Sequence, residues 1–175
     1  MPRNLIIFGS PDCNSFTARL LRQESADLKG ETVTYNCFKN MPAPCDGCGL
    51  CKKQDGCKFS DLDTFFNNFE KADNVIIAFP IYNGSFPAPL KALLDRFQRF
   101  FNKRFALGVK PPMNGKRDVT LIITAGCYTD PLPLILPQIK PLFTISGCSL
   151  KKAVLLLDTD NISPNQGFNP KIINF

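Results

Sequence analysis

The chain has 175 residues, of which 44% are hydrophobic and 21% charged, with a formal net charge of +6 and no histidine. These values predict one soluble domain, residues 1–175, whose mild positive charge needs no explanation beyond solubility. No apolar run approaches the roughly 20 residues that cross a bilayer and no signal peptide is seen, so we expect a cytoplasmic protein without a membrane partner.

Short apolar or β-branched runs alternate with helical patterns along the chain. Strands are predicted at 4–8, 31–36, 74–79, 119–126 and 153–158. Helices are predicted at 15–29, from Ser60 (a candidate cap), and at about 87–102. Such alternation predicts an α/β fold, with five parallel strands in the doubly wound order 2-1-3-4-5 between helical layers, a three-layer sandwich.

Two segments depart from this pattern. Between the last two predicted strands, Pro137 and Pro141 should kink or shorten any helix. The tail from Thr159 is polar and rich in Asn and Pro, which predicts irregular structure.

The loops after the first and third strands should lie together, where the winding of the sheet reverses. In "GSPDCNSFTARLL", hydroxyl and amide side chains precede a helix, which suits a phosphate monoester or simply caps the helix. In "PIYNGSFPAPLKALLDR", Pro80, Tyr82 and Gly84 suit a planar ring, although an ordinary βα turn would look similar.

These two segments, together with "IITAGC", resemble the flavodoxin-like NAD(P)H-dependent FMN reductase family over roughly residues 3–157. The resemblance implies bound FMN with its phosphate on Ser10, Asn14, Ser15, Phe16 and Thr17. It places the flavin ring along Pro80, Ile81, Tyr82, Asn83, Gly84 and Ser85, with Ala125, Gly126, Cys127 and Tyr128 lining the remaining side. The chain departs from the family at Asp12 and Cys13, where a basic residue or glycine is usual; an aspartate near a phosphate dianion is unfavourable.

The resemblance implies an oxidoreductase that passes electrons from NAD(P)H, or from a reduced carrier, through FMN to a quinone, free flavin or other small acceptor. No catalytic side chain is expected, because hydride transfer is the chemistry of the cofactors. A homodimer or homotetramer is also expected from the family.

A cysteine-rich insertion at about 41–59 carries the spacing C-x2-C-x2-C-x5-C in Cys45, Cys48, Cys51 and Cys57. The run resembles ferredoxin ligands and, within this fold group, the iron–sulfur flavoproteins, which implies a 4Fe-4S cluster. There are three alternatives. Structural zinc usually takes two separated C-x2-C pairs, and disulfides are disfavoured in a reducing compartment. The third alternative, a motif that holds nothing, is left open by the spacing. The remaining readings of function are an iron–sulfur and FMN electron relay, and a non-catalytic metal or redox sensor.

Residues 96–117 contain seven Lys or Arg and no acids, interleaved with phenylalanines. We interpret this segment as a helix with a buried aromatic edge and a solvated charged edge, and we expect no nucleic-acid partner.

Overall fold

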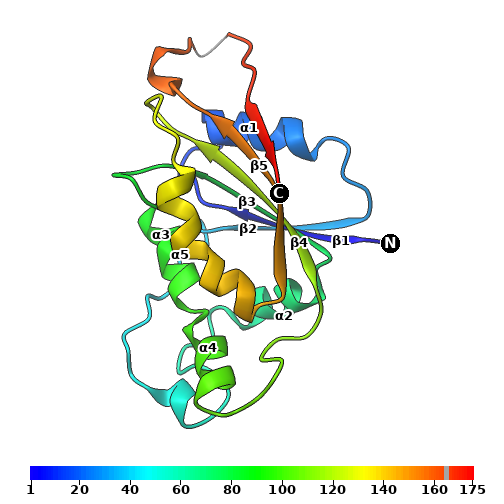
Figure 1. The fold of residues 1–175 in the computed structure, drawn as a ribbon, viewed down its shortest axis with the longest axis vertical. Helices are drawn as coiled ribbons and strands as arrows, with labels where there is room; N and C mark the ends of the chain where they lie inside the picture. The colour runs from blue at the N-terminus through cyan, green and yellow to red at the C-terminus, as the bar shows by residue number, and fades with distance from the viewer. Residues whose placement is uncertain (164–165) are drawn as a thin grey trace.

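The computed structural model describes residues 1–163 and 166–175. Within this part of the chain, six strands are hydrogen-bonded in the order β2-β1-β3-β4-β5-β6. They are β1 (Arg3–Phe8), β2 (Glu31–Asn36), β3 (Asn74–Pro80), β4 (Arg117–Thr124), β5 (Cys148–Leu156) and β6 (Lys171–Asn174). The first five are parallel in the predicted order, which confirms the flavodoxin-like topology (Figure 1). The prediction of a wholly irregular tail is wrong, because β6 pairs antiparallel with β5.

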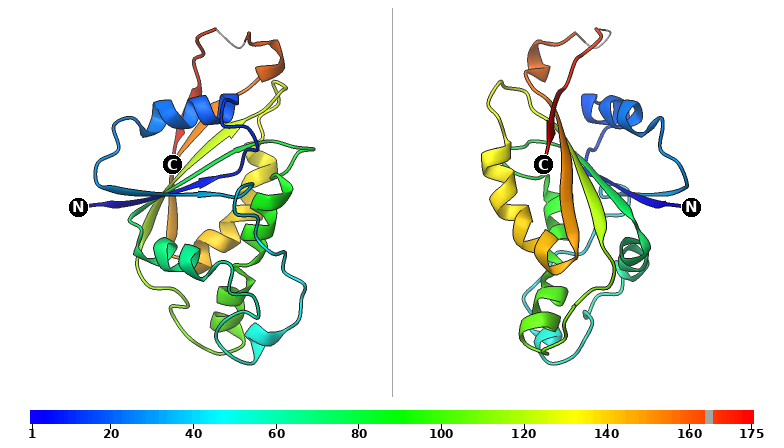
Figure 2. Two further views of the ribbon diagram at one scale, coloured as in Figure 1. Left: turned by 180° about the vertical axis from the view of Figure 1, so that it is seen from behind. Right: turned by 45° about the vertical axis from the view of Figure 1, so that its right-hand side comes forward.

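Helices cover both faces of the sheet. They are α1 (Phe16–Ser25), α2 (Asp63–Lys71), α3 (Ala88–Asp95), α4 (Gln98–Phe105) and α5 (Leu132–Ile145). The apolar side of α1 packs on one face, while α2, α3 and α5 pack on the other, so three layers form (Figure 2). Among the described residues, no helix combines the length and the apolar character that crossing a membrane would need.

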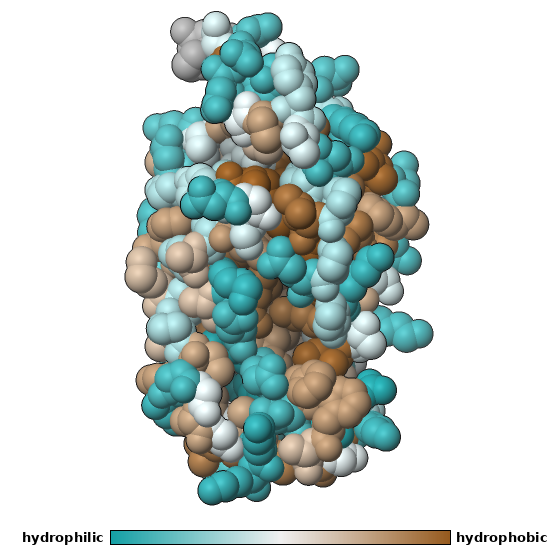
Figure 3. Space-filling view, turned by 60° about the vertical axis from the view of Figure 1, so that its left-hand side comes forward, coloured by the Kyte–Doolittle hydropathy of each residue, from teal (hydrophilic) through white to brown (hydrophobic). Residues whose placement is uncertain are grey.

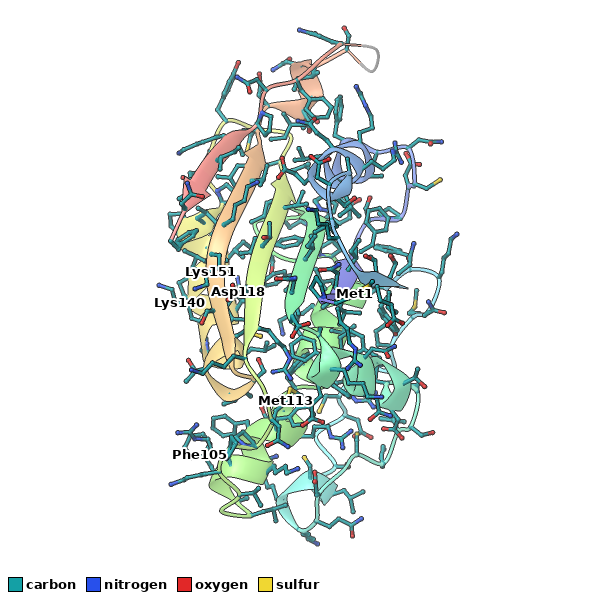
Figure 4. The ribbon with its side chains drawn as sticks, turned by 90° about the vertical axis from the view of Figure 1, so that its right-hand side faces the viewer. Met1, Phe105, Met113, Asp118, Lys140 and Lys151 are labelled. Atoms are coloured by element: carbon teal, nitrogen blue, oxygen red, sulfur yellow. The ribbon has the colours of Figure 1, made fainter. Side chains whose placement is uncertain are left out.

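Alternate residues of each central strand enter opposite layers. Leu5 and Ile7 belong to the core beneath α2 and α3, while Ile6 and Phe8 pack with α1. This is why the strand reads as a continuous apolar run. The start of the strands is more polar on the α1 face, where Lys151 and Asp118 pair at 3.7 Å on β5 and β4 (Figure 4). Helix α1 therefore covers mainly the carboxyl-terminal half of that face.

The predicted helix over about 87–102 is interrupted, because α3 ends at Asp95 and α4 starts at Gln98. The expected cap of the preceding helix is also wrong. Its N-cap residue is Leu62, with no side-chain hydrogen bond, and Ser60 contributes only its backbone carbonyl to the N–H of Asp63.

The basic segment does not have a wholly solvated charged edge. Arg96 and Arg117 are only 2% and 1% exposed, whereas Phe101 and Phe105 are exposed. Both buried arginines donate to backbone carbonyls, which replaces the water that their guanidinium groups lose. Phe97 and Phe100 are buried as predicted.

Helix α5 continues through both of its interior prolines, so the expectation that they would kink or shorten it is wrong as far as shortening is concerned. Pro137 and Pro141 lie on the exposed side, while Leu132, Ile135 and Phe143 lie on the buried side. An interior proline costs roughly 3 kcal/mol, whereas each large apolar side chain gains about 1.5–3 kcal/mol on burial. The buried stripe therefore outweighs the prolines.

Two groups near the end of β2 should make folding sensitive to alkaline pH. Burial raises the pKa of the Cys37 thiol from 9.0 to about 12. Burial, reinforced by the nearby Cys37, raises the pKa of Tyr35 from 10.0 to about 12. The folded chain therefore retains these protons where the unfolded chain loses them, so the free energy of unfolding should fall as pH rises from about 9 to about 12. Urea unfolding of wild type and Cys37→Ala across this range should show a shallower fall in the variant; parallel curves would contradict the assignment to Cys37.

Candidate functional site

Three loops meet at the carboxyl-terminal edge of the sheet. Strand β1 pairs with β3, and β3 with β4, all in parallel. The segments 9–15, 81–87 and 125–131 therefore leave neighbouring strands at the same edge (Figure 1). These segments contain most of the residues that the resemblance assigns to FMN, while Phe16 and Thr17 lie in the first turn of α1 and Pro80 ends β3. Their contact with the cofactor stays a prediction.

The loop after β1 is built around the start of α1. Ser15 caps this helix: its Oγ accepts the N–H of Ala18 at 3.2 Å and donates to the carbonyl of Asp12 at 2.8 Å. The Oγ of Ser10 lies 3.0 Å from that of Ser15. The first turn of the helix offers free N–H groups and the positive end of its dipole. This arrangement can accept a phosphate.

Contacts beneath the loop after β1 fix its position relative to the sheet. A Cβ on Gly9 would lie 2.9 Å from Leu90 Cδ2, so the close packing at this turn favours glycine. The hydroxyls of Thr17 and Thr124 lie 2.6 Å apart and are buried. The carbonyl of Thr124 also accepts the N–H of Ile81 at 2.8 Å. Thr124, which no sequence motif indicated, therefore ties the end of β4 to the first turn of α1 and to the loop after β3.

Asp12 is exposed, and its Oδ1 accepts the N–H of Asn14 at 2.8 Å. Asp12→Asn preserves this acceptor and removes the charge. Since a carboxylate beside a dianion repels it by about 1 kcal/mol at such a surface, the Kd for FMN should fall several-fold. Flavin fluorescence titrations of the apoprotein should show that the gain shrinks in about 1 M salt. Asp27→Asn, an exposed carboxylate beyond the other end of α1, is the control; equal Kd values would show that Asp12 does not face the phosphate.

The loop after β3 is a tight turn. The N–H groups of Tyr82 and Ser85 each donate to the carbonyl of the other residue at 3.0 Å. Between them, Asn83 and Gly84 have φ values of 49° and 73°. Positive φ at both central positions defines a type I′ turn, for which Asn-Gly is the preferred pair. This rigid turn carries Tyr82, whose side chain is 45% exposed.

The loop after β4 is paired with the chain that follows β5. The N–H groups of Thr159 and Asp158 donate to the carbonyls of Ala125 and Cys127 at 3.0 and 3.1 Å. A hydrogen bond to Asp158 raises the pKa of the exposed Tyr128. The carboxylate of Asp160 lies so close to Gly126 that a Cβ there would be 2.4 Å from its Oδ2. Asp158 and Asp160 add negative charge beside residues 125–128, which are predicted to line the flavin. The polar composition of the tail did not indicate that these carboxylates lie there.

The four cysteines of the insertion line one hollow of about 270 Å³. Cys45 and Cys48 are exposed, Cys51 and Cys57 are half-buried, and all four are free thiols. The opposite wall is supplied by Arg96, Gln98, Arg99 and Asn102. The hollow shares no residue with the three flavin loops, and the cyan segment lies toward the other end of the molecule (Figure 1).

Within the described residues, the thiols of this hollow are not brought together as a closed site for one metal ion. Among the residues that the structure describes, no three potential ligand side chains converge as a single metal site would require. A zinc ion bound at 2.3 Å brings sulfur atoms within about 4 Å of one another. Lys52 and Lys58 line the hollow beside the thiols, and Arg99 lines its opposite wall, so these cations would offset the negative charge of thiolates that bind a metal or a cluster.

Comparison with known proteins agrees with this geometry. The family of NADPH-dependent FMN reductases matches residues 2–127. An iron-sulfur flavoprotein of Methanosarcina thermophila is 39% identical over 107 residues, 58% of this chain and 55% of that protein. An FMN-dependent NADH:quinone oxidoreductase of Stenotrophomonas maltophilia is 27% identical over 135 residues, 75% of this chain and 69% of that protein.

Among solved structures, an FMN-dependent NADH-azoreductase of Bacillus anthracis in complex with FMN shares the fold. The TM-score is 0.64 with 18% identity, covering 93% of this chain and 90% of that one. The chain spans little more than half the length of the Methanosarcina relative.

Proposed function

Because the chain belongs to the NADPH-dependent FMN reductase family, we propose that it binds FMN at the carboxyl-terminal edge of its sheet and acts as an oxidoreductase. The electron donor would be NADH or NADPH, and the acceptor a quinone, free flavin or another small molecule. The observation that carries the proposal is the meeting of three prepared loops on neighbouring strands, at the point where the sheet reverses its winding.

Each loop would have a separate task. Ser10, Ser15 and the first N–H groups of α1 would bind the phosphate. The turn that carries Tyr82 would support one side of the ring, and residues 125–128 would line another. FMN supplies the acceptance and release of the hydride, so the chain needs no general base, in keeping with its lack of histidine.

The test is oxidation of NADH and NADPH by protein loaded with FMN, with a quinone or free flavin as acceptor. We expect turnover that requires FMN and saturates with one of the two nicotinamides. Tight FMN binding without oxidation of either nicotinamide would overturn the reductase assignment and leave the flavin site standing.

The second candidate function is an electron relay that carries both FMN and a 4Fe-4S cluster. The hollow with its four thiols supports it, as do the iron-sulfur flavoproteins among the relatives. Cys45, Cys48, Cys51 and Cys57 would hold the cluster, which would supply one-electron transfer. Protein purified without oxygen should then contain about four irons and matching acid-labile sulfide per chain; flavin bands without iron would exclude the relay.

We also propose a homodimer or homotetramer. Apolar surface gathers on the side of the molecule that includes α3 (Figure 3). A groove of about 180 Å³ between α3, α4 and α5 includes the exposed Phe101. Light scattering at several concentrations tests this assembly.

The eight free cysteines suit a reducing compartment, which supports a cytoplasmic location.

A further inference from the structure

A single side chain joins both ends of the cysteine loop. Arg96 Nη1 donates to the carbonyl of Ala43 and Nη2 to that of Phe59, each at 2.9 Å. These carbonyls lie just before Cys45 and just after Cys57, the first and last thiols of the loop. The guanidinium is buried and closes the base of the loop from the end of α3.

A carboxylate completes this closure. Asp61 Oδ1 lies 2.9 Å from Arg96 Nη1, and Asp61 Oδ2 accepts the N–H of Ala43 at 2.8 Å. The ring of Phe59 lies beneath the guanidinium, 5.1 Å from its central carbon. Arg96, Asp61, Ala43 and Phe59 thus form one connected unit, and every bond in it comes from the protein itself.

Helix α4 anchors the middle of the same loop. Asn102 Nδ2 donates to Cys51 Sγ at 3.1 Å, and Lys103 Nζ lies 2.7 Å from Asp55 Oδ2. The loop is therefore attached at its base and again between the second and fourth cysteines. Many small metal sites are unfolded until the metal binds; this loop has a bonded framework that needs none.

We propose that Arg96 is a positioning residue of the cysteine hollow, which holds the four thiols around that hollow before any metal arrives. The planar fork of arginine can bond two carbonyls and a carboxylate together, which the single ammonium of lysine does not match. Arg96 also lines the hollow, and its Nε is buried with no hydrogen-bond partner in the described part of the chain. The closure stands on its own contacts, and only the loading of a cluster rests on the second candidate function.

Hydrogen exchange of the metal-free protein tests the closure. In Arg96→Met, amides of residues 44–58 should exchange at least tenfold faster than in wild type, while those of β3 and β4 stay unchanged. Arg104→Met is the matched control, because Arg104 lies on α4 and stacks on Phe105. Loop exchange equal to that of the control would overturn the proposal.

A second variant covers the case in which Arg96→Met unfolds the whole chain. Asp61→Ala removes the outer part of the closure, and selective opening of residues 44–58 would support the proposal, whereas unchanged exchange would overturn it. Iron content after anaerobic reconstitution separates the positioning role of Arg96 from the hypothesis that the hollow holds a cluster. Wild type without iron rejects the cluster and leaves the exchange result valid; equal iron in wild type and Arg96→Met rejects the positioning role.

Discussion

Replacing Arg117 by methionine is expected to lower the free energy of unfolding by about 3–6 kcal/mol, against the roughly 5–15 kcal/mol typical of a whole protein. Arg117 is 1% exposed. Its guanidinium donates to the carbonyls of Phe69 and Glu70 near the end of α2, of Ser146 just after α5, and of Asn114. The last carbonyls of a helix lack partners within it and form the negative end of its dipole. Methionine fills similar space but removes the guanidinium donor from all four oxygens, so that Phe69 keeps only the N–H of Ala72 at 3.3 Å and Ser146 only the thiol of Cys148 at 3.8 Å.

The charge of Arg117 is not the whole reason for this expected loss of stability. Control variants separate the contribution of the charge from that of the hydrogen bonds. Burial lowers the pKa of Arg117, yet a guanidinium stays protonated in proteins, so the group acts as a permanently charged donor. Lys116→Met removes an adjacent exposed charge and should change stability by less than about 0.5 kcal/mol. Arg117→Lys keeps the charge but loses the planar fork of the guanidinium. It should lower the free energy of unfolding by an amount between those of Lys116→Met and Arg117→Met. Urea unfolding of the apoproteins measures all three; an Arg117→Met value close to that of Lys116→Met would contradict the role of the hydrogen bonds.

The topology could be predicted from the sequence because it depends on local signals. Five apolar runs separated by helical patterns permit few arrangements of a parallel sheet, and the usual one is the one observed. The errors occur where a distant partner decides the outcome. Nothing near Arg96 or Arg117 in the sequence indicates that each binds carbonyls about 30 to 50 positions away. For that reason both were expected to be solvated charges.

In the candidate site, too, features set by local signals could be predicted and features set by distant partners could not. The loops after β1 and β3 were identifiable because strand order alone brings them together. Thr124 and the aspartates 158 and 160 were not, because their significance depends on pairing between segments far apart in the chain. The cysteine spacing indicated a metal site, but only the folded chain shows that the wall opposite the thiols comes from α3 and α4.

Tyr82→Ala is expected to raise the Kd for FMN about 5- to 150-fold, since stacking of a flat heterocycle on an aromatic side chain contributes roughly 1–3 kcal/mol. Tyr82 makes its loop hydrogen bonds through the backbone, which alanine retains. Its side chain is 45% exposed at the end of β3, so removing the ring creates no cavity in the core. The stability of the apoprotein should therefore stay within about 0.5 kcal/mol of wild type, which separates a loss of flavin binding from a loss of folding.

Tyr82→Phe tells whether the ring or the hydroxyl provides the binding. If stacking dominates, phenylalanine should bind FMN within about threefold of wild type, because the ring face is preserved. A hydroxyl that hydrogen-bonds the flavin would instead make phenylalanine nearly as weak as alanine. Fluorescence titration of the three apoproteins distinguishes these cases, and the phosphate loop provides a reference because Asp12→Asn should act in the opposite direction. FMN bound equally by wild type and Tyr82→Ala would mean that the ring of the flavin lies elsewhere, since nothing else in the type I′ turn changes with that substitution.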